Sequence, residues 1–205
     1  MTVSEYLFAV KSDLFRYSGN NSFRSFVRCY LITPGFKYSF HMRTAKFLKT
    51  KGASLYPLYV VSRFILSHYQ YKYGISIPYN TDIGPGLYIG HFGGIVVNPC
   101  AKIGPNCNIN HCVTIGAAYG GKNPGTPEIL DNVYLGPGSK IIGGITLGRH
   151  SAVGANCVVT KSVPDNGVVV GIPGEVVSLK GSSEYVVNTI THLETQEDAS
   201  SQEGN

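Results

Sequence analysis

The sequence predicts a mainly β fold, a parallel β-helix built from six-residue repeats and preceded by an α-helical segment. An aliphatic residue recurs at six-residue spacing through most of the stretch from Ile83 to Pro164, and glycine usually follows it. This period fits neither an α-helix nor one long strand, so each hexad is one short strand and one turn, and three hexads close a triangular coil. The repeat positions are Ile83, Ile89, Ile95, Ile103, Ile109, Ile115, Ile129, Leu135, Ile141, Leu147, Val153 and Val159.

The repeat is interrupted twice. A single coil cannot bury its aliphatic side chains alone, whereas stacked coils bury them as continuous rows. Ile103 follows Ile95 by eight positions instead of six, and Ile129 follows Ile115 by fourteen. The second interruption contains residues 117–128, AAYGGKNPGTPE, whose glycines and prolines predict a loop that leaves the coil. A solenoid without chemistry leaves both interruptions unexplained, and exposed loops on rigid scaffolds often carry function.

The chain divides into three parts by pattern. Residues 1–75 lack the repeat and predict helices, with Thr33-Pro34-Gly35 as a break and Gly52 as a stop signal. Residues 76–180 form the predicted β-helix domain, which carries loop 117–128. Residues 181–205 are polar and acidic and lack a repeat, so we expect a mobile C-terminal tail.

The charge is unevenly distributed along the chain. Residues 1–75 have a net charge of +9 and residues 76–205 a net charge of −4, which together give +5. The basic half could meet an anionic membrane surface, an acidic glycan or the phosphates of CoA, and a solvated basic surface is the alternative. No nucleic-acid recognition motif is present, so we expect no nucleic-acid partner.

Targeting and metal-binding signals are absent from the sequence. Residues 1–10 do not resemble a signal peptide, and the most apolar stretch, residues 55–69, is too short to span a bilayer and is interrupted by Pro57 and Arg63. We therefore expect a cytoplasmic protein that can lie at the inner face of the membrane through its basic N-terminal segment. The five cysteines show no zinc spacing, so we expect reduced, buried thiols and no metal.

One histidine stands out as a candidate base. Transfer of an acyl group to a hydroxyl needs a base to remove the hydroxyl proton, and histidine is the usual base near neutral pH. His91 follows Ile89-Gly90 at a predicted corner and precedes Phe92-Gly93-Gly94, just before the first interruption. Such a histidine projects outward from the coil. Taken alone, the position fits an ordinary surface histidine better than a catalytic base.

The segment IGHFGGIVV, residues 89–97, resembles the catalytic-histidine segment of serine acetyltransferases. These are hexapeptide-repeat acyltransferases that fold as left-handed parallel β-helices. The spacing from His91 to the segment VTIG, residues 113–116, and the length of the following loop also match that family. The resemblance covers residues 76–175 well and residues 13–48 faintly. It implies that His91 is the general base and that acetyl-CoA is the co-substrate; a non-catalytic solenoid or adaptor is the alternative.

The resemblance also implies where CoA lies. In the family, CoA occupies a groove between the coil stacks of neighbouring subunits and contacts small corner residues. The matching positions here are Ala117, Pro137 and Ala155, and Lys161 matches a lysine near the CoA phosphates. Because this groove lies between subunits, the resemblance implies a homotrimer. Gly174-Glu175 replaces a common Ala-Arg pair, so one phosphate contact is missing.

Several positions depart from the family pattern. Ser76 stands where an aspartate orients the catalytic histidine, and Gly90 replaces another aspartate. Gly125-Thr126 replaces an Arg-His pair, and Gly19-Asn20-Asn21 replaces an Arg-Asp-Pro motif, which leaves Asn20 as an expected acceptor contact. Since the charges that hold a zwitterionic serine are missing, we expect a carbohydrate acceptor, as in the related O-acetyltransferases of capsule, exopolysaccharide and O-antigen clusters. L-Serine is then expected to be a poor acceptor, and serine acetylation in cysteine biosynthesis is the alternative.

Two further residues complete the predicted site. His111 lies about one coil after His91 and is expected to line the acceptor site, with a polar interface residue as the alternative. Tyr119 in the loop is expected to close over CoA and acceptor and to stack on a sugar or the pantetheine arm. A metal site formed by His91, His111 and His150 is not supported, because the histidine spacing of β-helical carbonic anhydrases is absent.

Overall fold

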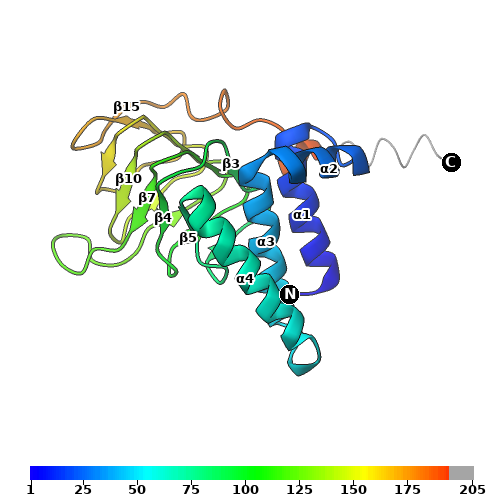
Figure 1. Cartoon of the computed structure of the whole chain (residues 1–205). Helices are drawn as coiled ribbons and strands as arrows, with labels where there is room; N and C mark the ends of the chain where they lie inside the picture. Colours follow the sequence, from blue (N-terminus) through cyan, green and yellow to red (C-terminus); the bar gives the residue numbers. More distant parts are fainter. Residues whose placement is uncertain (194–205) are drawn as a thin grey trace.

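The computed structural model describes residues 1–193, and within them it confirms the predicted parallel β-helix with N-terminal helices. Figure 1 shows the helices gathered against one end of the stack of coils. The helices are α1 (Val3–Ser18), α2 (Phe23–Ile32), α3 (Pro34–Lys49) and α4 (Tyr56–Tyr73), with a short 3₁₀ turn at Ala53–Leu55. Helix α1 begins with a capping box between Thr2 and Glu5 and ends at Gly19, which has a φ of +67°.

The strands form three parallel sheets, which are the three faces of the coil stack. Sheet A contains β1 (Ile75–Ser76), β4 (Ile95–Val97), β7 (Thr114–Gly116), β10 (Lys140–Ile142) and β13 (Val158–Val159). Sheet B contains β2 (Asp82–Ile83), β5 (Lys102–Ile103), β8 (Glu128–Ile129) and β11 (Thr146–Leu147). Sheet C contains β3 (Tyr88–Ile89), β6 (Asn108–Ile109), β9 (Tyr134–Leu135), β12 (Ala152–Val153) and β14 (Val168–Val170), and β15 (Glu175–Ser178) pairs antiparallel with β14.

The repeat positions form the core, and the first interruption is absorbed within one strand. In sheet C, Ile89 pairs with Ile109, which pairs with Leu135, and each of these side chains is at most 1% exposed. Strand β4 is three residues long, and both Ile95 and Val97 are buried in it. Ile95 pairs with Ile75 of the preceding coil and Val97 with Ile115 of the next. A slip of two residues keeps the same strand face inward, so the core continues without a break.

The second interruption is a hairpin-like loop that is tied back to the stack. Ala118 and Gly125 form an isolated antiparallel bridge at its base, and Tyr119 is 96% exposed. The Asn123 side chain donates to the Thr160 carbonyl (2.8 Å), and the Asn123 carbonyl accepts from Gly144 N–H (3.0 Å). The loop therefore has a fixed base and an exposed tip.

The first coil has no coil before it, so its outward backbone groups lack a strand partner. Unpaired edges of this kind invite association with other chains unless something covers them. Side chains of the helices form hydrogen bonds with several of these backbone groups. The Tyr38 hydroxyl donates to Ile77 O (2.8 Å) and lies 3.2 Å from Ile77 N, while the Tyr17 hydroxyl accepts from Ile89 N (2.8 Å).

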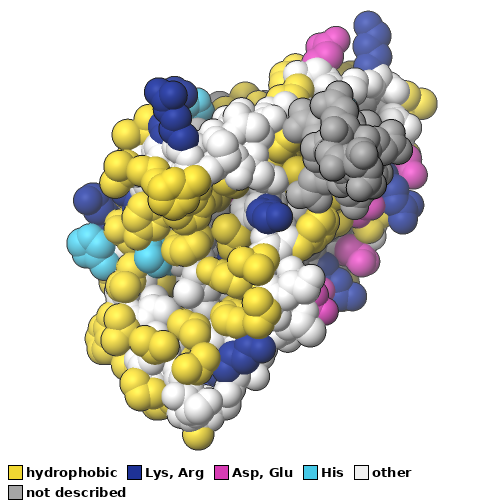
Figure 2. Space-filling model, turned by 90° about the vertical axis from the view of Figure 1, so that its right-hand side faces the viewer, with side chains coloured by type: hydrophobic (Ala, Val, Ile, Leu, Met, Phe, Trp, Pro, Cys, Tyr) yellow, Lys and Arg dark blue, Asp and Glu magenta, His cyan; other side chains and the backbone are white. Residues whose placement is uncertain are grey.

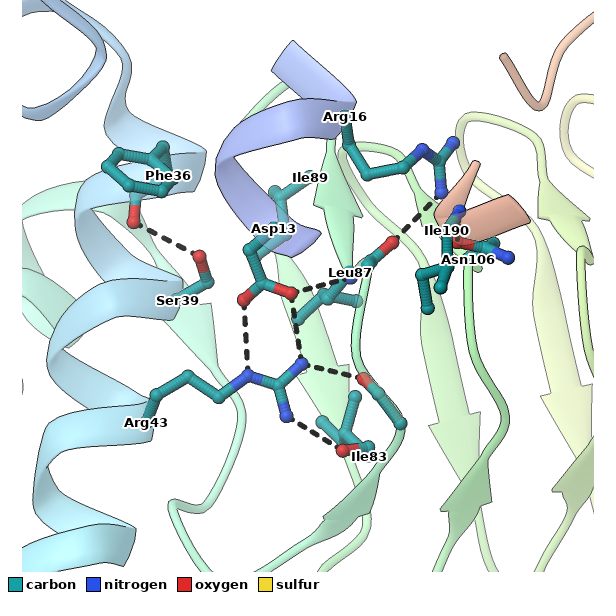
Figure 3. A network of polar contacts seen from close by, with 12 residues as sticks. Asp13, Arg16, Phe36, Ser39, Arg43, Ile83, Leu87, Ile89, Asn106 and Ile190 are labelled. Atoms are coloured by element: carbon teal, nitrogen blue, oxygen red, sulfur yellow. Dashed lines mark hydrogen bonds and ion pairs between the residues drawn. The ribbon is translucent and has the colours of Figure 1, made fainter. Parts of the chain in front are cut away.

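A buried ion pair forms the centre of this contact (Figure 3). Arg43 contacts both carboxylate oxygens of Asp13 at 3.1 Å, and it donates to the carbonyls of Ile83 (2.7 Å) and Gly84 (2.6 Å). Asp13 in turn accepts from Leu87 N (2.8 Å). Asp13 and Arg43 are 1% and 3% exposed, so this network joins α1, α3 and the first coil in a desolvated environment.

The C-terminal segment returns along the coils toward the helices (Figure 1). The Tyr185 ring stacks on Tyr134 at 4.4 Å, and the Tyr185 carbonyl accepts from the Asn108 side chain (2.9 Å). Arg16 donates to the Val187 carbonyl (2.9 Å). Residues 181–193 of the predicted mobile tail are thus packed on the stack, and residues 194–205 lie outside the described residues.

The helical end exposes many apolar side chains. Figure 2 looks at the face that lies on the right in Figure 1, and it shows hydrophobic side chains gathered over the left and centre of that face, with Lys and Arg side chains among them. On α2, Phe23 and Leu31 are 82% and 64% exposed, and Arg24 and Arg28 are also exposed. Across residues 1–193, no helix combines the length and hydropathy needed to span a bilayer.

The variant Arg43→Met tests the buried ion pair. It leaves Asp13 buried without its charge partner, which typically costs about 3–5 kcal/mol. For a chain of this size, we expect the Tm to fall by roughly 10 °C, measured by circular dichroism. The control is Lys102→Met, which removes an exposed charge from sheet B. Equal Tm values for the two variants would contradict a structural role for the network.

Candidate functional site

His91 lies at the corner between sheets C and A, directly after β3. The register of sheet C pairs residues 89, 109, 135 and 153, so the residues two positions further on stack above one another. The structure thereby brings four predicted site residues together in one column: His91, His111, Pro137 and Ala155. We call this set the histidine column. Pro137 and Ala155 are smaller than the two histidines, which leaves room beside the imidazole rings.

The two imidazoles are neighbours. Their ring centroids are 5.7 Å apart and their planes meet at 76°. His91 is exposed, whereas His111 is half-buried and its Nδ1 is buried without a hydrogen-bond partner. Among residues 1–193, no carboxylate hydrogen-bonds to the His91 ring. An exposed imidazole of this kind can accept a proton from a hydroxyl that lies beside it.

The identity of residue 90 has a steric reason. A Cβ atom on Gly90 would lie 2.8 Å from Oδ1 of Asn110, and real Cβ atoms almost never approach so closely. Asn110 is held in place because its Nδ2 donates to the Leu135 carbonyl (2.9 Å). An aspartate therefore fits at position 90 only if Asn110 moves.

Ser76 lies in β1, at the start of sheet A. Its hydroxyl pairs with Nε2 of Gln70 at 3.5 Å, at the outer limit of a hydrogen bond. No contact joins Ser76 to His91 in the described part of the chain. The polar partner of Ser76 in the described residues is therefore Gln70 of α4, and this weak contact does not fix the hydroxyl.

Asn20 lies in the turn between α1 and α2. Its Oδ1 accepts from Ser22 N (3.1 Å) and from the hydroxyls of Ser22 (2.9 Å) and Ser25 (2.7 Å). These contacts use the side chain within the turn itself. Within residues 1–193, no contact connects Asn20 to the histidine column.

A second column lies at the opposite edge of sheet A. The register of β7, β10 and β13 stacks Ala117, Gly143 and Lys161, and we call this set the loop column. A cavity of about 310 Å³ opens there between the loop and the coils, and both Lys122 and Lys161 line it. Lys161 also pairs with the exposed Glu175 (3.1 Å), a surface contact that contributes little stability.

The predicted CoA contacts therefore fall into two groups. Pro137 and Ala155 belong to the histidine column, whereas Ala117 and Lys161 belong to the loop column. The strands of sheet A separate the two, and three extended residues span roughly 10 Å. One protomer does not bring both groups to one point, so a site that uses both needs either a long ligand or a second subunit.

A further cavity was not predicted from the sequence. It has a volume of about 360 Å³, lies between α4 and the start of the first coil, and is lined by Arg63, Gln70 and Ser76 among others. The only signal in the sequence was Arg63 itself, a charge that interrupts the most apolar stretch of the chain.

The described side chains include no metal-binding cluster, and three of the five cysteines are buried. Within residues 1–193, no group of three or more His, Cys, Asp or Glu side chains could hold a metal ion. Cys29, Cys107 and Cys157 are buried as predicted, whereas Cys100 and Cys112 are exposed, so the prediction is wrong for those two. Burial raises the pKa of the Cys107 thiol to about 12, so this residue is a neutral core thiol rather than a nucleophile.

The comparisons with known proteins agree with this geometry. A family profile described as "Bacterial transferase hexapeptide (six repeats)" matches residues 126–161. A serine acetyltransferase from Mycobacterium tuberculosis is 36% identical over 151 residues, which cover 73% of this chain and 62% of the relative. The chain thus spans about 60% of the length of the curated relatives it matches.

Solved structures match over more of the chain. The serine acetyltransferase of Brucella abortus superposes with a TM-score of 0.71 at 28% identity and covers 88% of this chain and 72% of that one. The soybean serine acetyltransferase apoenzyme gives a TM-score of 0.69 at 30% identity, with coverage of 85% and 69%. The chain belongs to the hexapeptide-repeat acyltransferases. This membership confirms the left-handed β-helix that the sequence resemblance implied.

Two other matched structures contain ligands. The Brucella abortus enzyme has been solved in complex with coenzyme A; it is 27% identical, has a TM-score of 0.67 and is covered over 67% of its length. The Neisseria gonorrhoeae enzyme has been solved in complex with serine; it is 28% identical, has a TM-score of 0.68 and is covered over 69% of its length.

The predicted carbohydrate acceptor and role in polysaccharide biosynthesis are wrong. The relatives and solved structures named above are serine acetyltransferases, which supports the alternative prediction, serine acetylation. The prediction rested on the absence of charge at the positions that the family uses, and that absence does not exclude a charge on another element of the fold.

The close approach of Asn110 to residue 90 can be tested by a double-mutant cycle. Gly90→Ala places a methyl group against Oδ1 of Asn110, and overpacking of this kind typically costs about 1–3 kcal/mol. In an Asn110→Ala background the clash is absent, so the same substitution should cost much less. The measurement is the urea midpoint of the four proteins. Additive effects of the two substitutions would contradict the contact.

Proposed function

We propose that the protein is an acetyl-CoA-dependent O-acetyltransferase that transfers the acetyl group to the hydroxyl of L-serine. One observation carries the proposal. His91 lies exposed at a glycine-flanked corner, in a coil stack whose matched relatives and solved structures are serine acetyltransferases. The complexes of two such structures with coenzyme A and with serine support the choice of donor and acceptor.

The reaction needs one base and no covalent intermediate on the protein. His91 accepts the proton of the serine hydroxyl as the oxygen attacks the thioester carbonyl of acetyl-CoA. The tetrahedral intermediate then collapses, the C–S bond breaks, and the CoA sulfur receives the proton from His91. The products are O-acetylserine and CoA with a free thiol, and the imidazole returns to its neutral form.

Acetyl-CoA would extend along both columns. Lys122 and Lys161 can bind phosphate groups of CoA because neither lysine is buried. Lys161 would give up only its weak surface ion pair with Glu175 to do so. Pro137 and Ala155 offer a shallow surface beside His91 for the pantetheine arm. Since the two columns lie at opposite edges of sheet A, we propose a homotrimer in which the loop column of one subunit faces the histidine column of the next.

The remaining site residues have supporting roles in this proposal. His111 contacts the His91 ring and lines the acceptor side of the site. Ser76 lines the cavity between α4 and the first coil and forms no dyad with His91 in this proposal, because its hydroxyl pairs with Gln70. Tyr119, at the loop tip, is positioned to cover the pantetheine arm. Asn20 is used within its own turn, so we give it no role in the reaction.

Removal of the base tests the proposed reaction. His91→Ala should lower kcat by about 10²–10⁴-fold, the usual contribution of a general base, and should leave CoA affinity unchanged. The measurement is CoA thiol release with acetyl-CoA and L-serine. His68→Ala, which removes an exposed histidine from α4, is the control and should retain activity. Near-normal turnover in His91→Ala would exclude this histidine as the base.

The loop can be tested by shortening it. A variant in which two glycines join Gly116 to Pro127 removes Tyr119 and Lys122 while leaving sheets A and B intact. Because the loop contributes no repeat position to the core, we expect the Tm to change little. The KM for acetyl-CoA should rise and kcat should fall, since closure and phosphate contacts are both lost. Normal kinetics in the shortened protein would show that the loop has no part in the reaction.

A further inference from the structure

The cavity between α4 and the first coil contains a guanidinium group without a counter-ion. Arg63 lines this cavity of about 360 Å³ together with Ser67, Gln70, Ser76 and Asn80. Within residues 1–193, Arg63 has neither an ion pair nor a hydrogen bond. Its recorded contact is with the Tyr79 ring, whose centroid lies 4.2 Å from Cζ. No aspartate or glutamate lines the cavity.

This arrangement prepares Arg63 to bind an anion. The guanidinium packs on the Tyr79 ring, and Tyr79 is itself held by a hydrogen bond to Tyr59 (3.0 Å between the hydroxyl oxygens). Contact with the ring engages one side of the guanidinium and leaves N–H groups available, in the fork geometry that matches a carboxylate. Gln70 and Ser76 are joined only by a 3.5 Å contact, so both can turn toward a small polar ligand.

Part of the cavity wall lies at the same corner of the coil stack as the loop column. Residues 78–80 follow β1 at the corner where Ala117 follows β7, because residues 76, 96 and 114 are in register. Three of the residues that line the cavity, Pro78, Tyr79 and Asn80, therefore lie at the same edge of sheet A as the loop. In the homotrimer that we propose, this edge faces His91 of the partner subunit.

We infer that Arg63 binds the carboxylate of the amino-acid acceptor, and that the acceptor site combines Arg63 of one subunit with His91 of the next. This inference rests on the proposed serine acetyltransferase function. Gly125-Thr126 in the loop supplies no charge for that carboxylate, and Arg63 supplies one from a different element. The phosphates of CoA are assigned to Lys122 and Lys161. Lys122 lies in the loop after β7, two coils along the stack and thus roughly 10 Å away, and Lys161 follows β13, four coils along and roughly 19 Å away.

Substrate analogues test the first half of the inference. In Arg63→Gln, kcat/KM for L-serine should fall about 10–100-fold, mainly through KM, because a charged hydrogen-bonded pair is lost. The KM for acetyl-CoA should not change. L-Serinamide lacks the carboxylate and should be acetylated equally well by both proteins. Equal losses for the two acceptors, or a rise only in the KM for acetyl-CoA, would overturn the assignment.

Two further variants control this experiment. Arg24→Gln removes an exposed arginine from α2 and should leave all constants unchanged. Arg63→Lys keeps the charge but loses the paired N–H groups, so its KM for L-serine should lie between those of the wild type and Arg63→Gln. This graded series keeps the inference testable if Arg63→Gln folds poorly.

Mixed oligomers test the second half. His91→Ala and Arg63→Gln subunits are unfolded together and refolded in equal amounts. If each site takes Arg63 from one subunit and His91 from its neighbour, roughly a quarter of the sites are intact after statistical mixing. Activity above that of either parent is the expected result. No gain of activity in assemblies that are verified as mixed would overturn the shared site.

Direct binding separates this inference from the proposed function. Calorimetry measures L-serine binding to His91→Ala and to His91→Ala/Arg63→Gln, so no turnover is needed. Loss of binding in the second protein supports the Arg63 site even if the wild type fails to acetylate L-serine. Equal affinity in both proteins overturns the Arg63 site, even if the wild type proves to be an active serine acetyltransferase.

Discussion

The open edge of the first coil is the constraint on which the rest of this structure depends. A stack of parallel coils leaves backbone groups unpaired at its first turn, and the helices close that edge through Arg43, Asp13, Tyr38 and Tyr17. Because these groups are buried and hydrogen-bonded, the helices are held in one orientation on the coils. This orientation places α4 beside β1, and the cavity that contains Arg63 exists only because of it.

The parallel register of the coils determines where the site residues lie along the stack. Parallel pairing repeats each corner position once per coil, so His91 and His111 lie one above the other, with Pro137 and Ala155 on the following coils. Corner positions project from the stack, so substitutions there can change the chemistry while the aliphatic rows stay buried. The Gly90–Asn110 contact illustrates this freedom, since a bulky neighbour on one coil is matched by a glycine on the adjacent coil.

Much of the fold could be predicted because a six-residue aliphatic period has few structural solutions. The break near Ile95 was visible in the sequence, and the structure explains it through a strand that buries both Ile95 and Val97. His91 was found by resemblance. Arg63 was missed because its cavity forms only when α4 packs against β1, which no local pattern reveals. The carbohydrate prediction failed for the same reason: missing charges at matched positions do not show that the site lacks charge.

The most direct test of the account is identification of the product. The purified protein is incubated with acetyl-CoA and L-serine, and the mixture is analysed by mass spectrometry alongside a measurement of released CoA thiol. The account predicts O-acetyl-L-serine, with one ester formed for each thiol released and little release when L-serine is omitted. Thiol release without O-acetylserine, or no release above the rate without acceptor, would contradict it.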